Sequence, residues 1–123
     1  MKRTLMIAAL LIGFVAVSFA QKTEAKVIKL DQTPGEFVVK DLTLKPGKYI
    51  FEVSNTGVDH EVGFVLVPVT NGKEGDHIKA GYLSKAIKNG EKGSSKVVEL
   101  KAGTYNYFCP LNPTPHYKIV VKE

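Results

Sequence analysis

Apolar and polar residues alternate along several short stretches of this chain, and turn residues separate the stretches. The clearest alternation covers residues 48–54, where Tyr49, Phe51 and Val53 share one parity. A period of two is typical of a strand with one buried face. Further runs of this kind cover 26–30, 36–44, 61–69, 94–100, 104–109 and 116–122. Short strands at this spacing predict an all-β fold, either an antiparallel sandwich or a barrel.

The run 36–44 contains a change of parity. Phe37 and Val39 belong to one face, whereas Leu42 and Leu44 fall on the other. An extra residue in one strand shifts all later side chains to the opposite face. We therefore expect a bulge or bend near the junction of Lys40 and Asp41.

A single segment, 78–88, has helical rather than strand periodicity. Ile78, Tyr82 and Ile87 recur at near-helical spacing, and Asn89-Gly90 follows as a stop signal. The pattern predicts one short helix inserted between strands.

The N-terminus has the features of a secretory signal peptide. Lys2 and Arg3 precede an apolar run over 5–17, and small residues follow it at the cleavage spacing. A retained membrane anchor is the rival interpretation, but a bilayer span needs about 20 apolar residues. We expect residues 1–20 to be removed and 21–123 to form one domain outside the cytoplasm, in the periplasm or an equivalent compartment, without stable membrane insertion.

The charge balance restricts the classes of partner. The chain has 17 basic and 12 acidic residues, and Lys2 and Arg3 lie in the N-terminal stretch. The remaining excess of lysine is mild, which favours acidic protein surfaces only weakly. Without an arginine cluster, nucleic-acid binding is not expected. We expect a monomer.

The candidate chemistry rests on three side chains that are far apart in the sequence. Cys109 is the sole cysteine, His60 follows a turn, and His116 lies beyond a proline-rich loop. In an oxidising compartment a lone cysteine is buried and inert, paired with another chain, or bound to a metal. One thiolate and two imidazoles are the donor set of a mononuclear copper electron-transfer site. Each of the three, taken alone, is more often structural than a ligand, and His77 is expected to be a solvated surface residue.

Two motifs resemble those of the cupredoxins, the family of small blue-copper proteins that includes plastocyanin, azurin and pseudoazurin. They are Val53-Ser-Asn-Thr-Gly-Val-Asp-His60 and Ala102-Gly-Thr-Tyr-Asn-Tyr-Phe-Cys-Pro110. The resemblance implies a Greek-key β-sandwich and one-electron transfer outside the cytoplasm. It also implies that His60, Cys109 and His116 are equatorial ligands of one copper ion, Cu(I) or Cu(II). Asn55, at the turn position of the first motif, is expected to hydrogen-bond the ligand loops.

The chain departs from that family mainly at the axial ligand. Both methionines lie in the N-terminal stretch, and the loop from Cys109 to His116 is long. The axial position is then filled by apolar Ile119 or Val120, by a backbone carbonyl such as that of Asp59, by a carboxylate or by water; the carboxylate candidate is Glu61. An apolar or carbonyl neighbour is the preferred alternative.

The leading functional prediction is a one-electron carrier that docks on redox partner proteins. A copper-binding or delivery protein without a redox partner is the first alternative. A structural cupredoxin-like module without copper is the second. An enzyme is not expected, and no residue is assigned a catalytic role, because the sequence contains ligands for only one metal ion.

Overall fold

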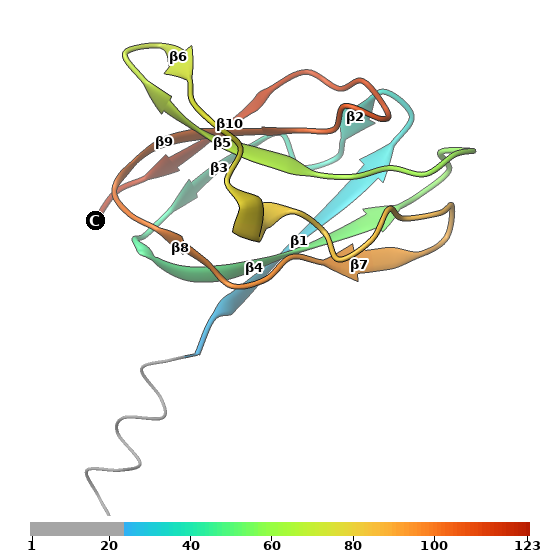
Figure 1. The fold of residues 1–123 in the computed structure, drawn as a ribbon, viewed down its shortest axis with the longest axis horizontal. Coiled ribbons are helices and arrows are strands. Elements are labelled where there is room, and N and C mark those ends of the chain that lie inside the picture. Colours follow the sequence, from blue (N-terminus) through green and yellow to red (C-terminus); the bar gives the residue numbers. More distant parts are fainter. Residues whose placement is uncertain (1–23) are drawn as a thin grey trace, which may run out of the picture.

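The computed structural model describes residues 24–123, so the predicted signal peptide lies outside the described residues (Figure 1). Ten strands follow one another along this part of the chain. They are β1 (Lys26–Thr33), β2 (Glu36–Phe37), β3 (Asp41–Leu44), β4 (Gly47–Asn55), β5 (Val65–Thr70), β6 (Lys73–Glu74), β7 (Lys92–Ser94), β8 (Val98–Leu100), β9 (Gly103–Phe108) and β10 (Tyr117–Val121). The predicted all-β fold is confirmed.

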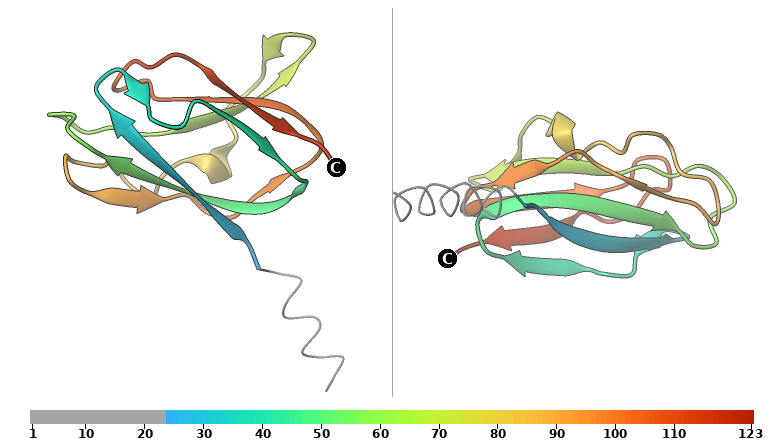
Figure 2. Two further views of the ribbon diagram at one scale, coloured as in Figure 1. Left: turned by 180° about the vertical axis from the view of Figure 1, so that it is seen from behind. Right: turned by 90° about the horizontal axis from the view of Figure 1, so that it is seen from below.

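The strands form two sheets that pack face to face (Figure 2). The first sheet has the order β2-β1-β4-β7, and β8 also pairs with β4. The second has the order β3-β10-β9-β5-β6. Most neighbours are antiparallel, but β1 pairs with β4 and β3 pairs with β10 in parallel. This is a Greek-key β-sandwich, with two parallel pairings that the alternation alone did not indicate.

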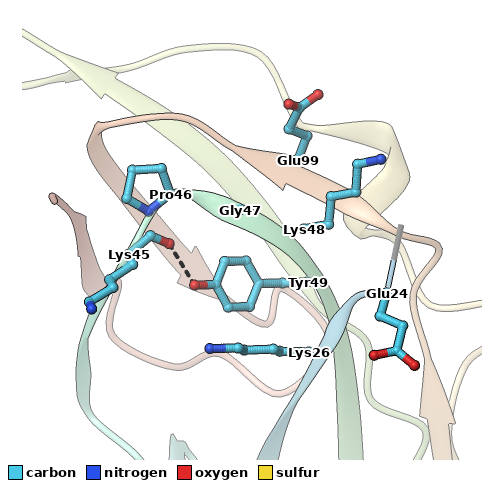
Figure 3. Close-up of a pocket in the computed structure, with 8 residues that line it drawn as sticks. All are labelled: Glu24, Lys26, Lys45, Pro46, Gly47, Lys48, Tyr49 and Glu99. Carbon is cyan, nitrogen blue, oxygen red and sulfur yellow. Dashed lines mark hydrogen bonds between the residues drawn. The ribbon is translucent and has the colours of Figure 1, made fainter. Parts of the chain in front are cut away.

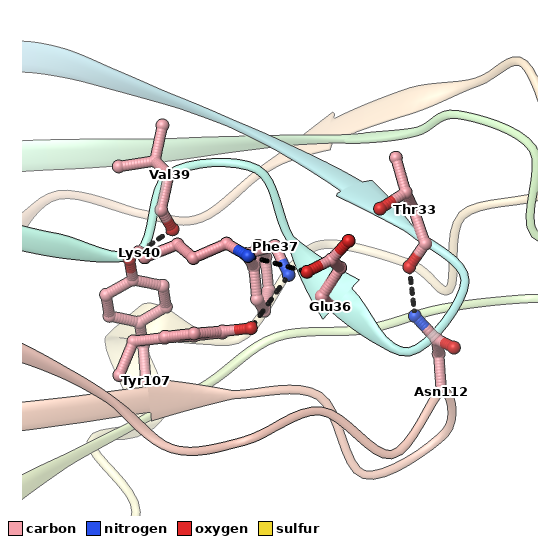
Figure 4. A network of polar contacts seen from close by, with 8 residues as sticks. Thr33, Glu36, Phe37, Val39, Lys40, Tyr107 and Asn112 are labelled. Carbon is pink, nitrogen blue, oxygen red and sulfur yellow. Dashed lines mark hydrogen bonds and ion pairs between the residues drawn. The ribbon is translucent and has the colours of Figure 1, made fainter.

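Aromatic side chains fill the space between the sheets. Phe37 meets the edges of Phe64 and Tyr107, with ring centroids 6.1 and 5.3 Å away. Tyr107 is fully buried, and its hydroxyl donates to the carbonyl of Val39 at 2.7 Å (Figure 4). Burial raises the pKa of Tyr107 because the phenolate loses its solvation. This hydrogen bond links the hydroxyl of Tyr107 to the connection between β2 and β3.

The change of parity in 36–44 marks a change of sheet. β2 pairs with β1 in the first sheet, whereas β3 pairs with β10 in the second. The bend expected near Lys40 is therefore the point where the chain crosses the sandwich. Residues on either side of it still face one core, because the two sheets present opposite faces to that core.

The helix predicted over 78–88 is wrong, apart from one 3-10 turn at Lys79–Gly81. The rest of this segment is irregular, with bends and two isolated bridges, because distant parts of the chain supply its backbone partners. Ile78 donates to Leu66 at 2.8 Å, and Ile87 exchanges two backbone hydrogen bonds with Val62. These tertiary contacts outweigh a weak helical pattern. Within residues 24–123 no helix is long and apolar enough to cross a bilayer.

A shallow pocket of about 390 Å³ opens beside the start of β4 (Figure 3). Its charged side chains come from three lysines and two glutamates, namely Lys26, Lys45, Lys48, Glu24 and Glu99. β4 ends at Asn55, and it is this far end that leads into the turn before His60. The pocket is therefore remote from the three candidate donors and holds no histidine or cysteine.

Candidate metal centre

Cys109 directly follows β9, and its side chain is buried in the core. Tyr107 and Cys109 point inward, since side chains alternate along a strand. The sulfur accepts two backbone hydrogen bonds, from Gly63 and from Asn112, each at 3.3 Å. Two N–H dipoles aimed at one sulfur are suited to a negatively charged thiolate. Backbone groups from two separate segments therefore hold the sulfur.

The loop between Cys109 and His116 is held by polar side chains of its own. The backbone N–H of Cys109 donates to the hydroxyl of Thr114 at 3.1 Å. The side-chain amide of Asn112 donates to the carbonyl of Thr33 at 2.9 Å, as Figure 4 shows. The loop is thus fixed to the end of β1, in addition to the stiffness that its prolines supply.

His60 lies on an exposed bend between β4 and β5. Its backbone carbonyl accepts a hydrogen bond from the buried side chain of Asn55 at 3.0 Å, which confirms the predicted role of that asparagine. The imidazole Nδ1 lies 3.0 Å from the backbone carbonyl oxygen of Glu61, which accepts a hydrogen bond from Nδ1–H. That contact leaves Nε2 as the ring nitrogen with a free lone pair.

His116 precedes β10 and has an exposed ring with two specific contacts. Its Nδ1 lies 2.6 Å from Oε2 of Glu74. The hydrogen bond from His116 is the main cause that lowers the pKa of Glu74, and Asn106 adds to it. The ring also stacks on Phe108, with a centroid separation of 3.8 Å and an interplanar angle of 3°.

The contact with Phe108 determines the side of the sheet on which the His116 ring lies. Phe108 and Cys109 are consecutive, so their side chains point to opposite faces of the second sheet. Cys109 belongs to the buried core cluster, which Phe108 does not join. The His116 imidazole therefore lies on the outer face, away from the sulfur.

The structure therefore does not bring the three predicted donors together as one metal site. Among residues 24–123, no group of three or more His, Cys, Asp or Glu side chains is arranged to hold a metal ion. The donors fit copper in kind, as one soft thiol and two imidazoles, but their arrangement is not that of a closed three-ligand site. Of the axial candidates, Ile119 is buried in the core, whereas Asp59 and Glu61 are exposed.

Two further residues near the sulfur were not predicted from the sequence. Gln32 is fully buried in β1, and its amide donates to the carbonyl of Gly63 at 3.1 Å. Gln32 shares the parity of Ile28 and Leu30, but the expected strand ended at residue 30, so its burial was not predicted. Gly63 also gave no signal, because its backbone rather than a side chain makes the contact with Cys109.

His77 is exposed, as expected, but is not simply solvated. Its Nδ1 lies 2.8 Å from the hydroxyl of Tyr82. Its ring meets the edge of Phe108 at a centroid distance of 6.3 Å. His77 and His116 therefore both contact Phe108, on the outer face of the second sheet.

The comparisons with known proteins agree with this fold. A family model described as a cupredoxin-like domain matches residues 5–121. A chloroplastic plastocyanin of Chlamydomonas reinhardtii is 32% identical over 111 residues, which cover 88% of this chain and 72% of that relative.

Two solved structures resemble the sandwich closely in shape. The structure of auracyanin B matches with a TM-score of 0.64 and 17% identity, over 82% of this chain and 91% of that one. Auracyanin A of Chloroflexus aurantiacus, described as a "blue" copper protein, matches with a TM-score of 0.62 and 19% identity, over 80% of this chain and all of that one. At these identities the two structures establish a shared fold.

Proposed function

This chain belongs to the family of cupredoxin-like domains, and from that premise we propose that it is a small copper protein that carries single electrons outside the cytoplasm. The observation that carries the proposal is the sulfur of Cys109, which is buried and already accepts two N–H hydrogen bonds. When bound, copper supplies the one-electron chemistry. The protein supplies the thiolate, its hydrogen-bond donors and a dry surrounding for it.

The proposed ligands are His60, Cys109 and His116. Cys109 needs no movement to act, since two backbone N–H groups already hold its sulfur. The two imidazoles are exposed and have to turn toward the sulfur for ligation. For His116 this means giving up Glu74 and Phe108. Copper binding is therefore proposed to be accompanied by rearrangement of the loops that carry both histidines.

The axial position has no methionine, and we propose that an apolar side chain or a backbone carbonyl occupies it. Ile119 or Val120 would be the apolar neighbour, and Asp59 would offer the carbonyl. Loss of a donor favours the reduced ion and raises the reduction potential. A copper form with a low potential and a carboxylate-type spectrum would instead point to Glu61.

The partners are proposed to be redox proteins that dock beside the Cys109 loop. A shallow groove of about 420 Å³ adjoins this loop. Its lining is mainly apolar and includes Gly63, Phe64, Tyr82, Leu83, Pro110 and Leu111. Lys85 is the charged member of this lining, which fits a partner with an acidic rim. A small patch of this kind suits brief contact between a monomeric carrier and its partner, and the chain is not proposed to be an enzyme.

The domain organisation is part of the proposal. Residues 1–20 are proposed to be a cleaved signal peptide and residues 21–123 the copper domain. The mature chain would then work in the periplasm or an equivalent compartment, without stable membrane insertion.

A second candidate is a structural cupredoxin-like module without copper. The observation that favours it is the position of the His116 ring on the outer face of the second sheet. A copper-delivery protein would be intermediate in copper affinity, since it would bind copper weakly and exchange it readily.

Titration of residues 21–123 with Cu(II) separates the candidates. If the protein is an electron carrier, we expect an intense thiolate-to-copper charge-transfer band whose intensity saturates at one copper per chain. The band should disappear in Cys109→Ser and weaken strongly in His60→Ala and His116→Ala. His77→Ala is the matched control, because it removes an exposed imidazole that is not a proposed ligand. A colourless protein with weak copper uptake would sink the carrier and favour the module.

A further inference from the structure

The sulfur of Cys109 belongs to a closed ring of four hydrogen bonds, which we call the thiol ring. The backbone N–H groups of Gly63 and Asn112 both donate to the sulfur at 3.3 Å. The side chain of Gln32 donates to the carbonyl of Gly63 at 3.1 Å. The side chain of Asn112 donates to the side-chain oxygen of Gln32 at 2.9 Å, which closes the ring.

The thiol ring joins three distant parts of the chain. Gln32 lies in β1, Gly63 lies before β5, and Cys109 and Asn112 belong to the loop after β9. Gln32, Cys109 and Asn112 are at most 5% exposed. No buried side-chain nitrogen or oxygen in residues 24–123 lacks a hydrogen-bond partner. A buried network whose members are all satisfied favours one arrangement strongly.

The orientation of both side-chain amides is determined by their partners. The nitrogen of Asn112 donates to Gln32 and to the carbonyl of Thr33, while its oxygen accepts from the N–H of Gly35 at 2.8 Å. Asn112 thus uses both ends of its amide. Gln32 must accept from Asn112 with its oxygen and donate to Gly63 with its nitrogen. Turning either amide over would place like groups together and leave buried polar atoms unpaired.

We propose that Gln32 and Asn112 are positioning residues for Cys109. They act through the backbone of Gly63 and Asn112, whose two N–H groups hold the sulfur. Through these groups they keep the thiol at one place and closed to solvent. The proposal concerns the sulfur of the proposed copper centre, but it is carried by contacts of the metal-free chain and is tested without copper.

The first test is the rate at which iodoacetamide alkylates Cys109 in metal-free protein, residues 21–123. Asn112→Asp and Gln32→Glu keep the size of each side chain but remove its donor. Losing a buried hydrogen bond changes the population of an opened state by about threefold to tenfold. We expect alkylation in either variant to be faster by about that factor or more. Asn89→Asp is the matched control, because Asn89 uses only its oxygen, which accepts from Gly57 at an exposed site; its rate should stay unchanged.

Parallel measurements separate positioning from general destabilisation. Urea unfolding gives the fraction of globally unfolded molecules in each variant. If Gln32 and Asn112 position Cys109, the measured alkylation rate should exceed the rate that this unfolded fraction alone would produce. In folded protein, hydrogen exchange at the amides of Gly63 and Asn112 should also accelerate, while amides of β4 keep their protection. Should either variant fail to fold, Gln32→Met and Asn112→Ser remove the same contacts without placing a carboxylate in the core.

Equal alkylation rates in the wild type and both variants would overturn the proposal. So would an increase that global unfolding fully accounts for. Failure to bind copper would sink the proposed function and leave these measurements unaffected, so the two failures are distinguishable.

Discussion

The imidazole of His116 lies flat on the phenyl ring of Phe108, with centroids 3.8 Å apart and planes within 3° of parallel. Glu74 holds the same imidazole through Nδ1. Because Phe108 and Cys109 face opposite sides of their strand, this stack competes directly with any approach of His116 to the sulfur. The energy of the stack is therefore part of the cost of copper binding under the proposed function.

Replacing Phe108 by leucine should tighten copper binding if His116 is a ligand. Aromatic stacking contributes about 0.5–1.5 kcal/mol beyond buried area, which corresponds to roughly threefold to tenfold in affinity. Competition for Cu(II) with a chelator of known affinity measures the change. His77→Ala is the control, since it removes the other ring that contacts Phe108 and should leave affinity unchanged. An unaltered affinity in Phe108→Leu would show that His116 does not leave the stack for copper.

The pKa of Glu74 should depend on His116 more than on any other residue. It lies below its ordinary value of 4.5, first because His116 hydrogen-bonds the carboxylate and then because Asn106 does. Carboxyl-carbon NMR of metal-free protein should show the pKa rising toward 4.5 in His116→Ala, and rising less in Asn106→Ala. Since the folded pKa is the lower one, the pair stabilises the fold above the ordinary carboxyl pKa and stops doing so as pH falls through the lowered value. A larger rise in Asn106→Ala would contradict this ranking.

Asn55 should be among the costliest polar residues to remove. Its buried amide donates to the carbonyls of His60 and Ile87, and its oxygen accepts from the N–H of Val58. Asn55→Ala leaves these groups without their partners, so we expect a loss of roughly 2–4 kcal/mol in the free energy of unfolding. Urea denaturation measures the loss. Asn89→Ala, at an exposed site, should cost less than about 1 kcal/mol. Equal losses in the two variants would refute the role given to Asn55.

Gly93 is required by the close approach of Ile87. A Cβ on residue 93 would lie 2.4 Å from Cδ1 of Ile87 and 3.5 Å from its Cγ1. Because Ile87 is fully buried, we expect Gly93→Ala to destabilise the fold by about 1–3 kcal/mol. Ile87→Val removes Cδ1, so the same substitution should cost less in that background. A double-mutant cycle tests the pair, and simple additivity would mean that the clash is relieved elsewhere.

The fold was largely predictable because its strands obey the period of two. Tyr49, Phe51 and Val53 are buried as their alternation indicates. The conformation of segment 78–88 was not predictable, because it depends on backbone hydrogen bonds with Val62 and Leu66. Such distant partners produce no pattern in the sequence of the segment itself. The parallel pairings of β1 with β4 and of β3 with β10 likewise depend on which strands meet, which alternation does not encode.

The sequence motifs predict the residue types of the candidate site but say nothing of their arrangement. The two motifs pointed to His60 and Cys109, and the structure puts each at the end of the sandwich where Asn55 lies. The position of His116 follows instead from Phe108 and Glu74, which belong to different strands. No spacing within the Cys109–His116 loop could reveal a competing partner so far away in sequence.

The location of β10 between β3 and β9 has a consequence for synthesis. β3 finds its partner only when Asp41 can meet Lys118, five residues before the end of the chain at Glu123. At a translation rate of about 5–20 residues per second, β3 waits about 4–15 s for that partner. Until then the nascent chain lacks β10, the strand that joins β3 to β9, so the second layer cannot close.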